Sequence, residues 1–112
     1  MDVRVVRQDE LPLSNIAREL VGADHGGLGA CIIFVDAPPG SGPSLHTHPY
    51  EEVLVVLDGE ATVTAGEREL VARAGDVVIV PADTPHAFTN TGAGPLRQID
   101  IHLSPSFNTT WL

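Results

Sequence analysis

Short runs of β-branched and aliphatic residues alternate with turn signals along almost the whole chain. Glycine- and proline-rich segments such as APPGSGP and NTGAGP separate these runs at short intervals. The pattern predicts strands at 3–6, 17–21, 29–36, 52–58, 61–65, 69–72, 76–81, 86–90 and 96–104. Many short, evenly spaced strands are typical of an antiparallel sandwich or barrel. We therefore expect an all-β fold, with one or two helical turns over 14–21, capped by Ser14, as an alternative for that segment.

Length and charge restrict the classes of protein that the chain can belong to. The 112 residues suffice for one domain with one core and not for two, so we expect a single domain over 1–112. A formal charge of −9, with arginine as the only basic residue besides histidine, disfavours binding to nucleic acid. The N-terminus has no apolar signal region, and no apolar run is long enough to span a membrane. We expect a cytoplasmic protein, in which the lone Cys31 is a small core residue.

The segment HTHPYEE, residues 46–52, concentrates residues that bind metal ions. His46 and His48 are two positions apart, so in a strand both side chains point to the same face. If this alternation continues past Pro49, Glu52 shares that face and Glu51 does not. His86, far along the chain, follows a proline that favours extended structure. Three imidazoles and one carboxylate suit Mn, Fe, Co, Ni, Cu or Zn. The sequence thus predicts one divalent transition metal ion per chain.

Two longer stretches carry a resemblance to a known family. The stretch GSGPSLHTHPYEEVLVVLDG, residues 40–59, resembles the first motif of the cupins at every fixed position. The stretch GDVVIVPADTPHAFTN, residues 75–90, is similar to the second cupin motif except at Asp83, where the motif has glycine. Aspartate is one of the few non-glycine residues that tolerate the left-handed backbone conformation such a turn needs. The resemblance implies a double-stranded β-helix, or jelly-roll barrel, formed by a single cupin domain.

The resemblance also implies a ligand set and a range of activities. Its metal ligands would be His46, His48, Glu52 and His86. Many cupins with three histidines and one glutamate are dioxygenases, which implies a dioxygenase acting on an enol or 1,3-dicarbonyl substrate. Glu52 would then be the ligand best able to act as a general base. Two alternatives stay open: Lewis-acid chemistry without O₂, such as isomerisation, cyclisation, decarboxylation or lyase chemistry, and binding of a small ligand without turnover.

Several other side chains are candidates for binding a substrate. Phe88 shares the face of His86, and Tyr50 is either a residue of the barrel mouth or simply exposed. On strand 96–104, Gln98 and His102 line the pocket if the polar face points inward, and Ile99 and Ile101 line it otherwise. Phe34 is either a core residue, the favoured interpretation, or a pocket residue. His25, between turn residues, is interpreted as an ordinary surface or core histidine.

Two strands are apolar on both faces, which a barrel strand exposed to water on one side is not. The runs VLVVL (53–57) and VVIV (77–80) have no polar position. A second subunit would cover their outer faces, so we expect a homodimer, although a crossing N-terminal segment of the same chain could cover part of them. The segment 3–6 is the candidate to cross between subunits, and the C-terminal FNTTWL would pack over the same region or over the barrel mouth.

Overall fold

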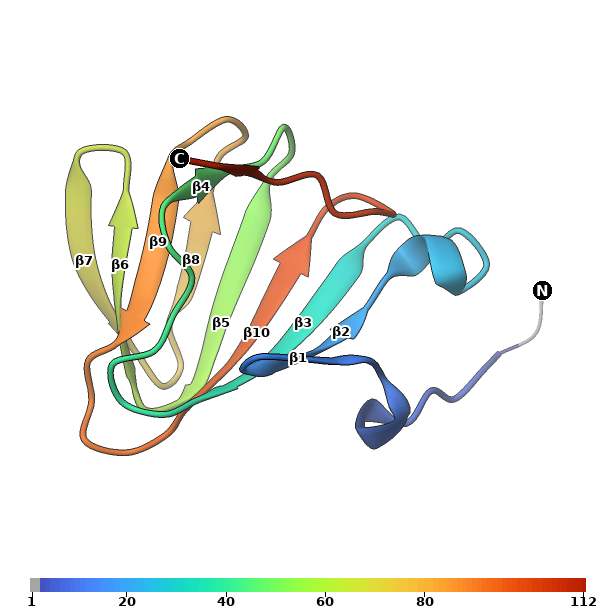
Figure 1. Ribbon diagram of the computed structural model, residues 1–112, viewed down its shortest axis with the longest axis horizontal. Coiled ribbons are helices and arrows are strands. Elements are labelled where there is room, and N and C mark those ends of the chain that lie inside the picture. Colours follow the sequence, from blue (N-terminus) through green and yellow to red (C-terminus); the bar gives the residue numbers. More distant parts are fainter. Residues whose placement is uncertain (1–2) are drawn as a thin grey trace.

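The computed structural model describes residues 3–112 as two antiparallel sheets that enclose one core (Figure 1). One sheet has six strands in the order β1 (Leu13–Ser14), β2 (Ala17–Leu20), β3 (Cys31–Ala37), β10 (Leu96–His102), β5 (Glu52–Asp58) and β8 (Val77–Val80). The other has five, in the order β11 (Thr110–Trp111), β4 (His46–Thr47), β9 (His86–Asn90), β6 (Glu60–Ala65) and β7 (Arg68–Arg73). Two short 3-10 helices, η1 (Gln8–Glu10) and η2 (Gly22–Asp24), complete the described chain. The predicted all-β jelly-roll barrel is confirmed.

The core forms because alternate residues of each strand point between the sheets. In β5, Leu54 and Val56 are almost fully buried, whereas Val53 and Val55 lie on the outer face. Val63 of β6 and Leu96 of β10 meet them from the two sheets, in a cluster that also includes Phe88. Cys31 is also fully buried, as expected for a core cysteine. One end of this core is polar and holds the histidines.

Eight of the nine predicted strands are present, and the ninth is wrong. Residues 3–6 are not a strand, and Val3 is 97% exposed. A short β-branched run has no stability by itself when no neighbouring strand accepts its hydrogen bonds. Segment 14–21 is not helical, because Ala17–Leu20 pairs with β3 along its whole length. The two-residue strands β1, β4 and β11 are too short to show periodicity, and the strand pattern does not predict them.

Two residues of the second motif tie it to the strands beside it. Asp83 has φ of +62°, the left-handed conformation expected where aspartate replaces the motif glycine. Its backbone N–H donates to the carbonyl of His48 at 2.8 Å, which fixes the chain just after β4. The buried Asn90 side chain donates to the carbonyls of Ala37 and Gly94, both at 2.9 Å. The Asp83 contact thus fixes the polar end of the barrel, and the Asn90 contacts join the ends of β3 and β9 at the opposite end.

Gly42 lies where two backbones approach too closely for a side chain. A Cβ at this position would overlap the carbonyl oxygen of Phe88. We expect Gly42→Ala to lower the free energy of unfolding by at least about 2 kcal/mol, because the loop or β9 has to shift. Urea denaturation measures the loss. Gly29→Ala is the control, since a Cβ there meets nothing within 4 Å. Equal stability of the two variants would contradict this packing.

The helical segments of residues 3–112 are short, and none has the length and apolarity needed to cross a membrane.

Candidate metal centre

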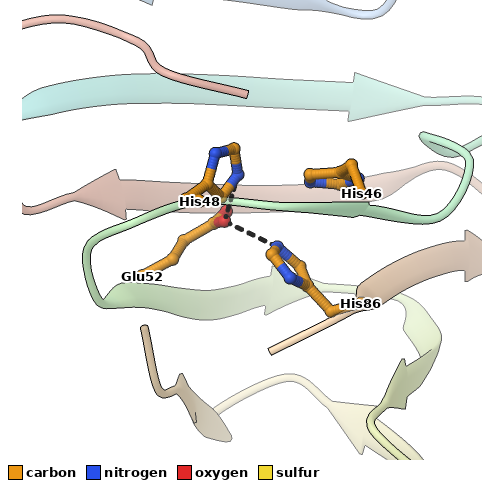
Figure 2. A group of neighbouring side chains, drawn as sticks. All are labelled: His46, His48, Glu52 and His86. Atoms are coloured by element: carbon orange, nitrogen blue, oxygen red, sulfur yellow. Dashed lines mark hydrogen bonds and ion pairs between the residues drawn. The ribbon is translucent and has the colours of Figure 1, made fainter. Parts of the chain in front are cut away.

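Four buried side chains from three strands and one loop converge at one end of the barrel (Figure 2). His46 of β4 pairs with His86 at the start of β9, so their side chains lie side by side. His48 follows two residues later on the same face, and Glu52 opens β5. One potential ligand atom of each residue lies within 4.8 Å of those of the other three. The structure therefore brings together the four residues that the spacing selected.

Hydrogen bonds to backbone carbonyls set the tautomer of all three histidines. The Nδ1 atoms of His46, His48 and His86 lie 2.6, 3.0 and 2.7 Å from the carbonyl oxygens of Ser44, Asn108 and Thr84, respectively. A carbonyl oxygen can only accept, so each Nδ1 carries the hydrogen. In the neutral rings, the lone pair is then on Nε2, the atom that faces the cluster. Three preset imidazole donors of this kind are what metal sites use.

Hydrogen bonds within the cluster do not satisfy all of its buried polar atoms, whereas a divalent ion would. The Nε2 atom of His48 is buried and has no hydrogen-bond partner within residues 3–112. It lies 3.2 Å from Glu52 Oε1, which is close enough for an electrostatic contact but lacks hydrogen-bond geometry. His86 Nε2 lies 3.0 Å from the same oxygen and donates to it only when the ring is protonated, because its Nδ1 already donates to Thr84. A buried nitrogen left without a partner is costly, and a metal ion would satisfy it. Three nitrogens and one oxygen suit Mn, Fe, Co, Ni, Cu or Zn.

The histidines keep Glu52 ionised. Burial alone would raise its pKa, but the contacts with His102, His48 and His86 outweigh burial and hold the pKa of Glu52 well below its usual range. Burial also lowers the pKa of His46, which favours its neutral, metal-binding form. For His86, burial acts in the same direction, but its hydrogen bonds to Glu52 and Thr84 raise the pKa. Glu51 is exposed and takes no part in the cluster, as the alternation of side chains past Pro49 requires.

The second carboxylate oxygen of Glu52 contacts a histidine outside the set of four. His102 of β10 places Nε2 3.2 Å from Glu52 Oε2. The Tyr50 hydroxyl lies 2.8 Å from His102 Nδ1 and 3.3 Å from the backbone nitrogen of Asn108. Asn108 N–H donates to the hydroxyl, whose own hydrogen is then free to be donated to His102 Nδ1. In this arrangement the hydrogen of His102 is on Nε2, toward Glu52. Oε1 is left to face the three imidazoles.

The sequence model of the Cupin_2 family, described as a cupin domain, matches residues 33–102. This chain is a cupin. The matched region contains both motifs and all four residues of the cluster. The resemblance on which the fold prediction depended is therefore confirmed.

Curated relatives of this cupin differ in kind. "Polyketide synthase CurC" from Streptomyces cyaneus is 36% identical over 86 residues, which cover 76% of this chain and 53% of CurC. "HTH-type transcriptional regulator PuuR" from Escherichia coli is 29% identical over 107 residues, which cover 92% of this chain and 58% of PuuR. The chain thus spans a little more than half the length of either protein.

Solved structures similar to this cupin include two oxalate decarboxylases. A structure from work on the Mn(II) centres of the Bacillus subtilis enzyme has a TM-score of 0.81 at 24% identity, covering 93% of this chain and 30% of that one. The Lactobacillus farciminis enzyme in a formate complex has a TM-score of 0.80 at 23% identity, covering 93% and 34%. At this level of identity the likeness shows the fold alone.

The cluster of this cupin opens into a cavity of about 470 Å³. Phe88 and His102 line the cavity, as two of the predicted substrate residues. The C-terminal segment closes one side of it: Thr110 and Trp111 form β11 against β4, and the dark red tail in Figure 1 crosses the barrel beside β4. Of the two positions considered for this tail, the structure has the one over the barrel mouth. Further lining residues not singled out from the sequence include Asp100, Phe107, Thr109 and Trp111.

Three of the predicted substrate residues lie elsewhere. Gln98 is on the inward face of β10, but its side chain is buried and donates to Asp100 Oδ1 at 2.7 Å. Phe34 follows the opposite alternation from the inward Val35 and borders a different cavity, of about 420 Å³. Tyr50 stacks on His48, with ring centroids 5.0 Å apart, and is not part of the wall of the metal cavity. The polar face of β10 is thus the inward one, although only part of it reaches the metal cavity.

We expect His102 to affect metal affinity although it is not one of the four ligands. His102→Leu should weaken binding about 10- to 100-fold, the usual cost of removing a group that orients a ligand. His102→Gln should recover much of the loss, because an amide can both donate to Glu52 and accept from Tyr50. Competition with a chromophoric chelator measures the affinity. His25→Gln is the control, since His25 lies outside the cavity. Equal losses in the Leu and Gln variants would contradict an orienting role.

Proposed function

We propose that this cupin is a metal-dependent enzyme whose substrate is an enol or a 1,3-dicarbonyl compound. The observation that supports the proposal most directly is the buried cluster of three imidazoles and one carboxylate, which opens into a cavity large enough for a small organic molecule. Four protein ligands leave up to two positions free on an ion that can be six-coordinate, and free positions distinguish catalytic sites from structural ones. The two oxygens of an enolised dicarbonyl match such a pair of positions.

Different residues of the chain would bind the metal, exclude water and transfer a proton in such a reaction. When bound, the ion supplies a Lewis-acidic centre that stabilises an enolate and, if redox-active, permits chemistry with O₂. His46, His48 and His86 hold it, and Phe88 forms part of the wall that excludes water. Glu52 would take the proton that enolisation releases. Donation from His102 to its Oε2 would stabilise the carboxylate form, which keeps Glu52 ionised until the proton arrives.

Within this class, we propose a dioxygenase as the first candidate. The second candidate is a non-redox cyclase or isomerase that uses the ion only as a Lewis acid. The relationship to CurC, whose name is that of a polyketide synthase, favours the second, because polyketide chains carry carbonyls in 1,3 relation. The relationship to PuuR, named as a transcriptional regulator, favours a third outcome in which the domain binds its ligand without turning it over.

Metal analysis and oxygen uptake separate these candidates. Mass spectrometry of the untagged protein identifies the resident ion, and zinc would argue against oxidation. A panel of diketones is then assayed with an oxygen electrode and, in parallel, under argon. Oxygen uptake matched to substrate loss supports the dioxygenase, and substrate loss under argon supports the Lewis-acid enzyme. Metal-dependent binding of a diketone without loss in either assay would make the domain a binding module and contradict the proposal of an enzyme.

We also propose that the protein is a homodimer formed through the outer face of the six-stranded sheet. This face carries a continuous apolar surface from β10, β5 and β8, made up of Ile99, Ile101, Val53, Val55, Leu57, Val77 and Ile79. Ile79 is 65% exposed and Val77 58% exposed. At about 25 cal/mol per Å², covering such a surface favours association by several kcal/mol before the entropy costs.

Light scattering at micromolar concentration tests the dimer, for which we expect a mass near twice 11.8 kDa. Ile79→Asp should give the monomer, because it places a charge at a strongly exposed position of the apolar face. Val71→Asp is the control, since Val71 is a similarly exposed aliphatic residue on the other sheet. A monodisperse monomer for the unchanged protein would rule out the proposal.

A further inference from the structure

The wall of the metal cavity carries negative charge and no fixed positive charge. Its ionisable residues besides the histidines are Glu19, Glu52 and Asp100. No arginine of residues 3–112 lines it, and the sequence contains no lysine. Asp100 is buried, and burial together with the charge of Glu52 raises its pKa, so it is neutral more readily than an ordinary aspartate. The bound ion would therefore be the only fixed positive charge available to an anionic group of a substrate in this cavity.

The same wall is lined by aromatic rings on both sides of the cluster. Trp111 of the C-terminal segment lies 4.9 Å from the ring of His46, centroid to centroid, and Phe107 lies 5.1 Å from the ring of His102. Phe88 of β9 belongs to the same five-stranded sheet as Trp111 and also lines the cavity. Aliphatic residues of β2 and β3, with the loop before them, fill the space between: Ile16, Ala17, Ile33 and Val35. Flat apolar surfaces of this kind favour a flat apolar ligand.

The size of the cavity also favours a ligand with a ring. A volume of about 470 Å³ lies within the range of about 300–1,000 Å³ that accommodates drug-sized molecules. A two-carbon dianion would leave most of the apolar wall in contact with water, so the wall would contribute nothing to its affinity. A ligand with a ring beside its chelating oxygens would cover that wall and displace the water.

We propose that the cavity selects a ring-bearing 1,3-dicarbonyl or hydroxy ketone that has no carboxylate or phosphate group. The chelating oxygens face the four-residue cluster, and the ring lies against Phe88 and the C-terminal aromatic residues Phe107 and Trp111. This inference rests on the proposed function, because it assumes a metal-chelating ligand. It adds that the C-terminal segment, which is outside both cupin motifs, contributes to the selection of that ligand.

The C-terminal segment is fixed well enough for this role. Trp111 pairs with His46 across β11 and β4, and Leu112 N–H donates to the carbonyl of Leu45 at 3.0 Å. The carbonyl of Asn108 accepts from His48 Nδ1. The segment therefore orients one of the metal-binding imidazoles and supplies a wall of the cavity at the same time. Trp111 is also the only tryptophan of the sequence, so its fluorescence reports on the cavity directly.

Titration calorimetry on the zinc-loaded protein tests the proposal, since zinc is redox-inert and binding is then separate from turnover. The probes are benzoylacetone, acetylacetone, oxalate and benzoylacetone with a para carboxylate. We expect benzoylacetone to bind at least 10-fold more tightly than acetylacetone, which has the same chelating group without a ring. We expect oxalate and the carboxylated probe to bind at least 10-fold more weakly than benzoylacetone. Quenching of Trp111 fluorescence by benzoylacetone provides an independent measurement.

Variants of the aromatic wall show whether the ring is what the protein recognises. Phe107→Ala and Trp111→Ala should each lower the affinity for benzoylacetone at least 5-fold while leaving that for acetylacetone unchanged. Unchanged acetylacetone binding also shows that the metal cluster is intact in the variant. Trp111→Phe should keep most of the preference for the ring. Leu103→Ala is the control, because Leu103 is exposed and lies outside the cavity.

The possible failures differ in what they contradict. If acetylacetone binds as tightly as benzoylacetone, or oxalate binds most tightly, the inference about the ring and the charge is wrong and the proposed function stands. If neither diketone binds the zinc-loaded protein, both are overturned. If the diketones bind as expected but the aromatic variants do not change the preference, the role of the C-terminal wall is overturned.

Discussion

Glu52→Gln is expected to lower the affinity for the metal by at least about 100-fold and to abolish any metal-dependent activity. Removal of a group that only orients a ligand costs about 10- to 100-fold, so loss of the anionic ligand itself should cost no less. The substitution keeps the size of the side chain and removes its negative charge. Oε1 of this carboxylate lies 3.2 Å from His48 Nε2 and 3.0 Å from His86 Nε2. Metal content after gel filtration and chelator competition measure the effect.

Glu51→Gln is the matched control. Glu51 is adjacent in sequence and chemically identical, but its side chain is exposed and it contributes to the fold through its carbonyl, which accepts from Leu103 N–H at 3.1 Å. We expect metal content and affinity to be nearly unchanged. If Glu51→Gln released the metal and Glu52→Gln did not, the assignment of the carboxylate would be wrong.

The metal is expected to raise thermal stability by an amount that grows with pH. At a free metal concentration of 1,000 Kd, binding stabilises the folded state by about 4 kcal/mol. For a domain of this size, that corresponds to roughly 15–25 °C in Tm. Because a metal ligand must be an unprotonated imidazole, the gain should be largest near pH 8 and smallest near pH 5.5.

The metal-free protein has the opposite pH dependence, because protonation of its cluster stabilises the fold at low pH. The pKa of His86 is raised in the folded protein by its hydrogen bonds to Glu52 and Thr84, which outweigh burial. A raised pKa contributes stability below the unfolded value of about 6.5, and this contribution is lost as pH rises through the folded value. The pKa of Glu52 is depressed, so its carboxylate stays ionised over this whole interval. The difference in Tm between metal-loaded and chelator-treated protein should therefore widen from pH 5.5 to 8.

Scanning calorimetry with and without a strong chelator measures this difference. The Glu52→Gln variant serves as the control, because it should show little difference at any pH. A Tm at pH 8 that does not respond to the chelator would show that the ion is absent or contributes little to folding.

The strands could be predicted from the sequence because their signal is local. A run such as residues 52–58 is β-branched, short and bounded by turn residues, and each of these properties is visible without knowledge of its neighbours. The four clustered residues could be selected for a related reason. Spacing by two within a strand places side chains on one face, which favoured Glu52 over Glu51 before any tertiary contact was known.

The sequence does not predict strands correctly where their formation depends on a partner strand. Residues 3–6 have strong β propensity, but no strand of the described chain pairs with them, and they are not a strand. The strands β4 and β11 are the reverse case. They have little propensity as isolated pairs of residues, and they exist because His46 faces His86 on one side and Trp111 on the other. Pairing energy across the sheet, rather than local preference, decides both outcomes.

Side-chain alternation alone groups the residues of a strand into two faces, and it does not say which face is inside. On β10 the sequence left both faces open, and only the pairing with β3 and β5 turned Gln98, Asp100 and His102 inward. The same register put Phe34 on the outside. Likewise, nothing local to the last six residues places Trp111 beside His46. The sequence by itself thus determined the strands and the metal-binding face, because both follow from periodicity along the chain. The residues that line the cavity beside that face were decided by the tertiary structure, because contacts between residues far apart in the chain bring them together.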